Sequence, residues 1–208
     1  GPKEVHDYNR KFIQGSNYEQ VVKWIKIFDQ EYKKRNIKNR RIGALVTLTR
    51  KSLSYPKEII DYAKTKDILL IPGMEKTIEG GHVLILGLTN IPEINKVSDL
   101  KKLDDSALIV AAHPFFPKLH SLREKLEPNI EHFHGIEHSF YYRKFINFNK
   151  KAMRLAKKHK KTIVGTSDVH DLKCFNLTYS LIDSEKDIKS VIKAVKENKI
   201  QLVTKRTP

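Results

Sequence analysis

The chain has 208 residues, which is enough for one domain with a substantial core. Lysine and arginine number 40 against 24 aspartate and glutamate residues, so the formal net charge is +16. The 9 glycines, 8 prolines and single cysteine exclude collagen-like, low-complexity and disulfide-scaffold proteins. We therefore expect a single globular domain over residues 1–208, in which Gly1-Pro2 is a cloning remnant.

The basic charge and the lone cysteine indicate which partners and which cellular compartment to expect. A net charge of +16 attracts phosphate-bearing partners, although the same lysines could simply be solvated surface groups of a lysine-rich protein. Cys174 alone fits a reducing compartment. The longest apolar runs are far shorter than the ~20 residues that span a bilayer, and no signal sequence opens the chain. We expect a soluble, cytoplasmic protein with no membrane partner.

Apolar, β-branched runs alternate with helical patterns along the whole chain. The runs that predict strands are Ile42–Thr49, Ile68–Ile71, Val83–Leu88, Ala107–Ala112, Thr162–Gly165, Thr178–Ile182 and Gln201–Thr204. Helical stripes cover residues 21–32, 59–63, 145–156 and 188–195, the last with Ser184 as a candidate N-cap. Runs without polar alternation indicate strands covered on both faces, as in a parallel sheet. The pattern predicts an α/β fold, either a barrel or a doubly wound sheet, with functional groups at the carboxyl ends of strands.

Imidazoles and carboxylates gather at these strand ends. Each has an ordinary explanation as a hydrogen-bonded or exposed side chain, and only their convergence from separate strands suggests a site. The residues concerned are Glu75 after the second expected strand, His82 at the start of the third, His113 after the fourth, and Asp168 and His170 after the fifth. Mixed nitrogen and oxygen donors suit Zn, Mn or Fe(II) better than Mg or Ca.

Several short segments together resemble, in order and spacing, the polymerase-and-histidinol-phosphatase (PHP) superfamily of metal-dependent phosphoesterases. The resemblance covers residues 5 to 183 and is carried by Pro72-Gly73-Met74-Glu75, Gly81-His82-Val83-Leu84, Ala111-Ala112-His113-Pro114-Phe115, Gly135-Ile136-Glu137 and Ser167-Asp168-Val169-His170. It implies a distorted (β/α)₇ barrel, related to the TIM barrel. It also implies hydrolysis of phosphate esters with up to three metal ions.

The resemblance also implies which residues hold each ion. One ion would be held by Glu75, His82 and His113, and a second by Glu75 and Asp168 with Asp7 as a substitute ligand. A third would need His170, and His138 at another strand end is a further candidate ligand. We expect one or two divalent ions, either Mn, Zn or Fe.

Two family motifs are altered in this chain. Asp7 and Asn9 stand where a His-x-His pair is usual, and Thr47-Leu48-Thr49 stands in place of Thr-Asp-His. Arg50 and Lys51 follow directly, and their charge could neutralise a substrate phosphate or take the place of a missing ion. The altered motifs make a complete three-ion centre unexpected.

Two functions are therefore open at this point. The first is a metal-dependent phosphoesterase, in which Asp168 or His170 acts as general base or orients the attacking water. Its substrate would be a phosphorylated small molecule, a nucleotide or a nucleic acid. The alternative is a catalytically inactive PHP module that binds nucleic acid or a protein partner through a basic surface.

Overall fold

A computed structural model describes residues 61, 63–65, 67–117, 120–139, 147–166, 168 and 177–205. The chain divides into two compact units, residues 1–70 and 71–208. In the first unit, residues 61 and 63–65 are helical and a turn follows at Asp67. The expected strand Ile42–Thr49 and the helical stripe at 21–32 lie outside the described residues. The second unit contains every strand described below.

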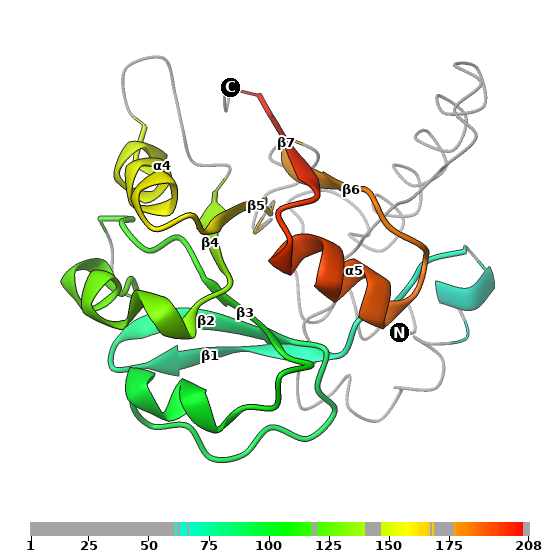
Figure 1. The fold of residues 1–208 in the computed structure, drawn as a ribbon, viewed down its shortest axis with the longest axis horizontal. Helices are drawn as coiled ribbons and strands as arrows, with labels where there is room; N and C mark the ends of the chain where they lie inside the picture. Colours follow the sequence, from blue (N-terminus) through cyan, green and yellow to red (C-terminus); the bar gives the residue numbers. More distant parts are fainter. Residues whose placement is uncertain are drawn as a thin grey trace, which may run out of the picture. The chain divides into compact units, whose positions relative to one another are not determined.

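The second unit is built on a five-stranded mixed sheet, whose strands follow one another in chain order (Figure 1). Its strands are β1 (Gly73–Ile78), β2 (Gly81–Leu86), β3 (Leu108–Ala111), β4 (Gly135–His138) and β5 (Thr162–Gly165). The two pairings from β1 to β3 are antiparallel, and the two from β3 to β5 are parallel. The α/β class is confirmed, but half of the pairings in this sheet differ from the expected parallel arrangement.

A two-residue turn explains why the first pairing is antiparallel. Glu79 and Gly80 join β1 to β2 with φ values of 49° and 86°. Positive φ at both central residues is typical of a type I′ hairpin turn, whose twist matches that of the strands it joins. Glycine adopts this conformation without steric cost, which suits it to the second position of the turn.

Apolar side chains pack on both faces of the sheet. Val83 and Ile85 of β2 belong to the larger core with the helix α4 (Asn149–Lys158), whereas Leu84 packs on the opposite face with α5 (Ile188–Lys196). This alternation follows from the two-residue period of a strand. Short 3₁₀ helices η2 (Val97–Lys102), η3 (Arg123–Lys125) and η4 (Glu127–His132) complete the unit, and η2 and η4 add side chains to the larger core. The continuous apolar runs thus predicted correctly that both faces are covered.

A separate two-stranded sheet consists of β6 (Thr178–Ile182) and β7 (Ile200–Thr204), and α5 lies between these two strands in the sequence. It meets β5 through a side chain, since the Ser180 hydroxyl accepts from Gly165 N at 2.9 Å and lies 3.2 Å from Gly165 O. No backbone ladder joins β5 to β6. The sheets are therefore open among the described residues, and they do not form a closed barrel there.

Most expected elements of the second unit lie where the sequence placed them. The strands at Thr162–Gly165 and Thr178–Ile182 match in both bounds. The strand expected at Ile68–Ile71 is wrong, because these residues make no ladder and β1 begins only at Gly73. Ser184 is also wrong as the N-cap of α5: Asp187 is the cap, and its carboxylate accepts from Ser190 N at 2.9 Å. No described helix has the length and apolar character that crossing a membrane requires.

We predict that replacing Asp187 with alanine lowers the thermal midpoint of unfolding by about 2–4 °C, because the first turn of α5 loses its only side-chain acceptor. Asp187→Asn should keep most of the stability. Ser184→Ala is the matched control and should leave the midpoint unchanged. A larger effect at Ser184 than at Asp187, measured by circular dichroism, would contradict this assignment.

Candidate metal centre

Glu75 and His82 meet because of the register of the β1–β2 hairpin. Glu75 is paired with Leu84 and Thr77 with His82, so Glu75 and His82 are diagonal neighbours on one face of the sheet. Diagonal neighbours lie within reach of long side chains. Leu84 packs on the α5 side of the sheet, which places both functional side chains on that face.

His113 reaches the same place from the other side of β2. Val83 pairs with Ala111, and Ala112 N donates to His82 O at 3.2 Å, so His113 follows directly after the residue beside His82. Since β2 and β3 are antiparallel, the start of β2 lies at the carboxyl end of β3. The three residues thus come from the middle of one strand, the start of the next and the end of a third.

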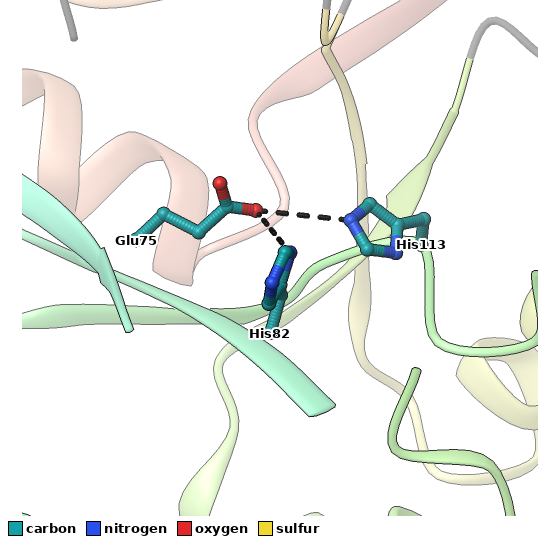
Figure 2. A group of neighbouring side chains, drawn as sticks. All are labelled: Glu75, His82 and His113. Carbon is teal, nitrogen blue, oxygen red and sulfur yellow. Dashed lines mark ion pairs between the residues drawn. The ribbon is translucent and has the colours of Figure 1, made fainter. Parts of the chain in front are cut away.

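The three side chains converge on one point (Figure 2). His82 Nδ1 lies 3.1 Å and His113 Nε2 lies 3.7 Å from Glu75 Oε1. One ligand atom from each residue lies within 4.8 Å of the other two. The imidazole rings of His82 and His113 meet edge to face, with centroids 5.2 Å apart.

These separations fit a shared divalent ion. Two ligand atoms bound tetrahedrally at Zn–N or Zn–O distances are about 3.3 Å apart, which is close to the two distances to Glu75. His82 faces Glu75 with Nδ1 and His113 faces it with Nε2. Each of these nitrogens can bind a cation when it carries no proton. Two imidazoles and one carboxylate suit Zn, Mn or Fe(II).

The electrostatics of the centre keep the carboxylate charged. A hydrogen bond from His113 and the charges of both imidazoles hold the pKa of Glu75 below its ordinary value, against the opposing effect of burial. Burial lowers the pKa of His82. Burial also acts to lower the pKa of His113, but the hydrogen bond to Glu75 and the charges of Glu137 and Asp168 outweigh it, so that pKa is raised.

Glu137 is a residue beside the centre to which the sequence analysis gave no role. It lies in β4 with 1% of its surface exposed. His113 N–H donates to its Oε2, and the Thr166 hydroxyl donates to its Oε1. Burial raises the pKa of Glu137 to about 7, because ionising a carboxyl group inside a protein costs several kcal/mol. The sequence signal that could have found it is an acidic residue directly after Gly135-Ile136.

His138, by contrast, is not part of the group. It alternates with Glu137 along β4, so it shares the face of Ile136, which belongs to the larger core. That face is opposite to the one that carries Glu75 and His82. Its imidazole is buried, and burial lowers its pKa. The ionisable side chain of β4 that faces the centre is therefore Glu137, one residue before the predicted His138.

Of the remaining predicted site residues, Asp168 is the one that the structure describes. Asp168 lies near enough to affect the pKa values of His113 and Glu137, but it is not one of the three grouped donors. Its φ is 33°, in the left-handed region that few residues other than glycine adopt. His170, Asp7, Arg50 and Lys51 lie outside the described residues.

A further imidazole, His120, lies at the rim of the centre. His82 N donates to His120 O at 3.0 Å, and the two rings are stacked with centroids 4.7 Å apart. Gly81 permits this approach, because a Cβ atom there would lie 2.7 Å from Leu122 N. His120 is exposed. Nothing in its local sequence distinguishes it from an ordinary loop histidine.

Comparison with known proteins adds a fold likeness. No protein-family model and no curated protein matches the chain. Among solved structures it is similar to a two-domain protein from Bacteroides vulgatus that contains a predicted PHP-like metal-dependent phosphoesterase, with a TM-score of 0.55 and 18% identity. That match covers 77% of this chain and 51% of the other, so this chain spans about half the length of that protein.

A second solved structure, PsfC from Pseudomonas syringae, matches at 14% identity over 66% of this chain and 60% of the other. Its TM-score of 0.48 is too low to add to the first likeness. At these identities the comparisons concern the fold alone. The fold of this chain is thus similar to that of a protein that contains a predicted PHP-like phosphoesterase.

We predict that the protein binds one divalent ion through Glu75, His82 and His113. A residue that only hydrogen-bonds to a metal ligand contributes about 10- to 100-fold to metal affinity, and a ligand itself contributes more. Glu75→Ala and His113→Ala should therefore each weaken Zn²⁺ affinity by at least about 100-fold. Isothermal titration of metal-stripped protein measures this. The control is His159→Ala. The imidazole of His159 also lies beside a carboxylate, 3.3 Å from Glu127, but the second partner of Glu127 is Lys158 and not a histidine. Equal losses in all three variants would contradict the assignment.

Proposed function

We propose that the protein is a metal-dependent phosphoesterase of the PHP type. The observation that carries this proposal is the convergence of one carboxylate and two imidazoles on one point of the sheet. The likeness to a structure that contains a PHP-like phosphoesterase supports the same class. The proposal includes the distorted barrel of that superfamily.

The proposed chemistry divides between the ion and the chain. A bound divalent ion would act as a Lewis acid that withdraws charge from a phosphoryl oxygen and acidifies water. Glu75, His82 and His113 would hold that ion. Asp168, whose charge acts on His113, would accept a proton from water or hold the water in line for attack. We assign His170 the same role as an alternative, and Asp7 the role of a further ligand.

The substrate of this proposed enzyme carries a phosphate ester. A net charge of +16 attracts anions, and we propose that Arg50 and Lys51 neutralise the phosphate. A phosphorylated small molecule and a nucleic acid both meet this requirement.

We predict turnover of generic phosphomonoesters and phosphodiesters by purified protein loaded with Mn²⁺, Zn²⁺ or Fe²⁺. Asp168→Asn should lower kcat by about 10²- to 10⁴-fold, the usual contribution of a general acid or base. Glu75→Ala and His113→Ala should lose activity completely, and His159→Ala should keep it. Turnover in the wild type that does not exceed that of the Glu75→Ala variant would refute the enzymatic function.

A second candidate function is favoured by the surface of α4. Its exposed residues include Lys150, Lys151, Arg154, Lys157 and Lys158, and no acidic residue lies in the helix. One of these cations, that of Lys158, is paired with Glu127 at 2.7 Å. This basic face fits the phosphate backbone of a nucleic acid, which an inactive PHP module would bind without chemistry.

The second candidate predicts that the affinity for duplex DNA falls steeply with salt, with log K against log salt sloping by roughly −0.9 for each phosphate contacted. Lys150→Glu with Arg154→Glu should reduce both the affinity and the slope. Lys189→Glu with Lys193→Glu on α5 is a control with the same charge change. Fluorescence anisotropy measures the binding. A slope near zero would rule out the nucleic-acid function.

A further inference from the structure

Glu137 makes contacts that no requirement of the core explains. Glu137 is 1% exposed and lies on a sheet whose neighbouring side chains are mostly apolar. Its two oxygens accept from two different segments, the backbone N–H of His113 and the hydroxyl of Thr166. These segments follow β3 and β5, the two neighbours of β4. One side chain thus connects the ends of three adjacent strands beside Glu75, His82 and His113.

The backbone of His113 needs such a contact. Its φ is 28°, in the left-handed region that side chains other than hydrogen disfavour. Its carbonyl oxygen is held by Phe116 N and by the Ser121 hydroxyl, each at 3.0 Å. Its N–H is held by Glu137. Because the N–H on one side of Cα and the C=O on the other are both held, rotation about the N–Cα bond is restricted, and with it the direction in which Cβ and the imidazole point.

We propose that Glu137 is a positioning residue of the metal centre, which aims the His113 imidazole by holding the His113 backbone N–H. This inference rests on the proposed function, because it takes His113 to be a metal ligand. Glu137 itself contacts neither metal nor substrate in this role. Partners that orient a ligand in this way commonly contribute about 10- to 100-fold to metal affinity.

Two substitutions separate this role from general stability. Glutamine at position 137 keeps an oxygen for His113 N–H, and its NH₂ group can donate to the Thr166 hydroxyl, which is able to accept. Alanine removes both contacts. Asn149 offers a matched control at the same end of β4, because it is also buried, at 3% exposed, and its amide makes two 3.0 Å hydrogen bonds with the backbone of Ser139.

The experiment compares the wild type with Glu137→Ala, Glu137→Gln and Asn149→Ala in the full chain. We expect Glu137→Ala to weaken Zn²⁺ affinity about 10- to 100-fold and Glu137→Gln to stay within about threefold of the wild type. Asn149→Ala should lower the thermal midpoint while the affinity is unchanged. Co²⁺ absorption spectra should show altered ligand geometry in Glu137→Ala alone.

Three results would overturn the inference. Glu137→Ala could bind Zn²⁺ like the wild type, Glu137→Gln could lose as much affinity as Glu137→Ala, or Asn149→Ala could lose affinity in proportion to its stability. If Glu137→Ala does not fold, Glu137→Gln takes its place in the comparison: a loss of Zn²⁺ affinity well beyond about threefold in Glu137→Gln, or any loss in Asn149→Ala, would then overturn the inference.

Failure of the proposed function is distinguishable from failure of this inference. If the proposed function fails, the wild type itself binds no metal and turns over no phosphoester. The positioning role is then read in metal-free protein by nuclear magnetic resonance. Loss of Glu137 should increase the hydrogen exchange of the His113 amide and shift the His113 imidazole resonances, while those of His159 stay in place. Unchanged His113 resonances would overturn the inference.

Discussion

The register of β2 between its two neighbours is the constraint on which the candidate centre depends. β2 pairs with β1 on one side and with β3 on the other, both antiparallel. This arrangement brings the middle of β1, the start of β2 and the end of β3 to one place. A shift of one residue in either pairing would turn Glu75 or His82 to the other face. The apolar side chains that alternate along β2 prevent this shift, because each set is buried against a different layer.

Burial and strand direction are separate properties, and the apolar runs report only the first. Val83–Leu86 is covered on both faces, as a run without polar alternation predicts. Its antiparallel direction comes from the two residues Glu79 and Gly80, whose positive φ angles close a hairpin. The rule that functional groups follow strand ends therefore holds for His113, at the end of β3. The rule fails for Glu75, which lies within β1. His82 lies at the start of β2, and it reaches the same place only because β2 runs antiparallel to β3, so that its start lies beside the carboxyl end of β3.

The alternation of a strand also decides between two neighbouring ionisable residues. His138 attracts attention as an imidazole at a strand end, yet it faces the larger core. Glu137, one residue earlier, faces the centre and accepts hydrogen bonds from His113 and Thr166. Its burial keeps its pKa near 7, unlike that of Glu75, which two imidazoles hold low. Two carboxyl groups close to His113 thus differ because the hydrogen bond from His113 outweighs burial at Glu75, whereas burial outweighs the charge of His113 at Glu137.

The amino-acid sequence was enough to predict the α/β class, the burial of β2 on both faces and the residues that carry metal-binding chemistry, since these follow from residue type and spacing. It also brought Glu75, His82 and His113 together as a set, through resemblance to a family. The folded structure was needed to show that the sheet is mixed, that Glu137 rather than His138 faces the centre, and that Asp187 caps α5. These outcomes depend on strand direction, on which face a residue occupies and on backbone angles such as that of His113. They are set by contacts between segments far apart in the chain, which no local pattern contains.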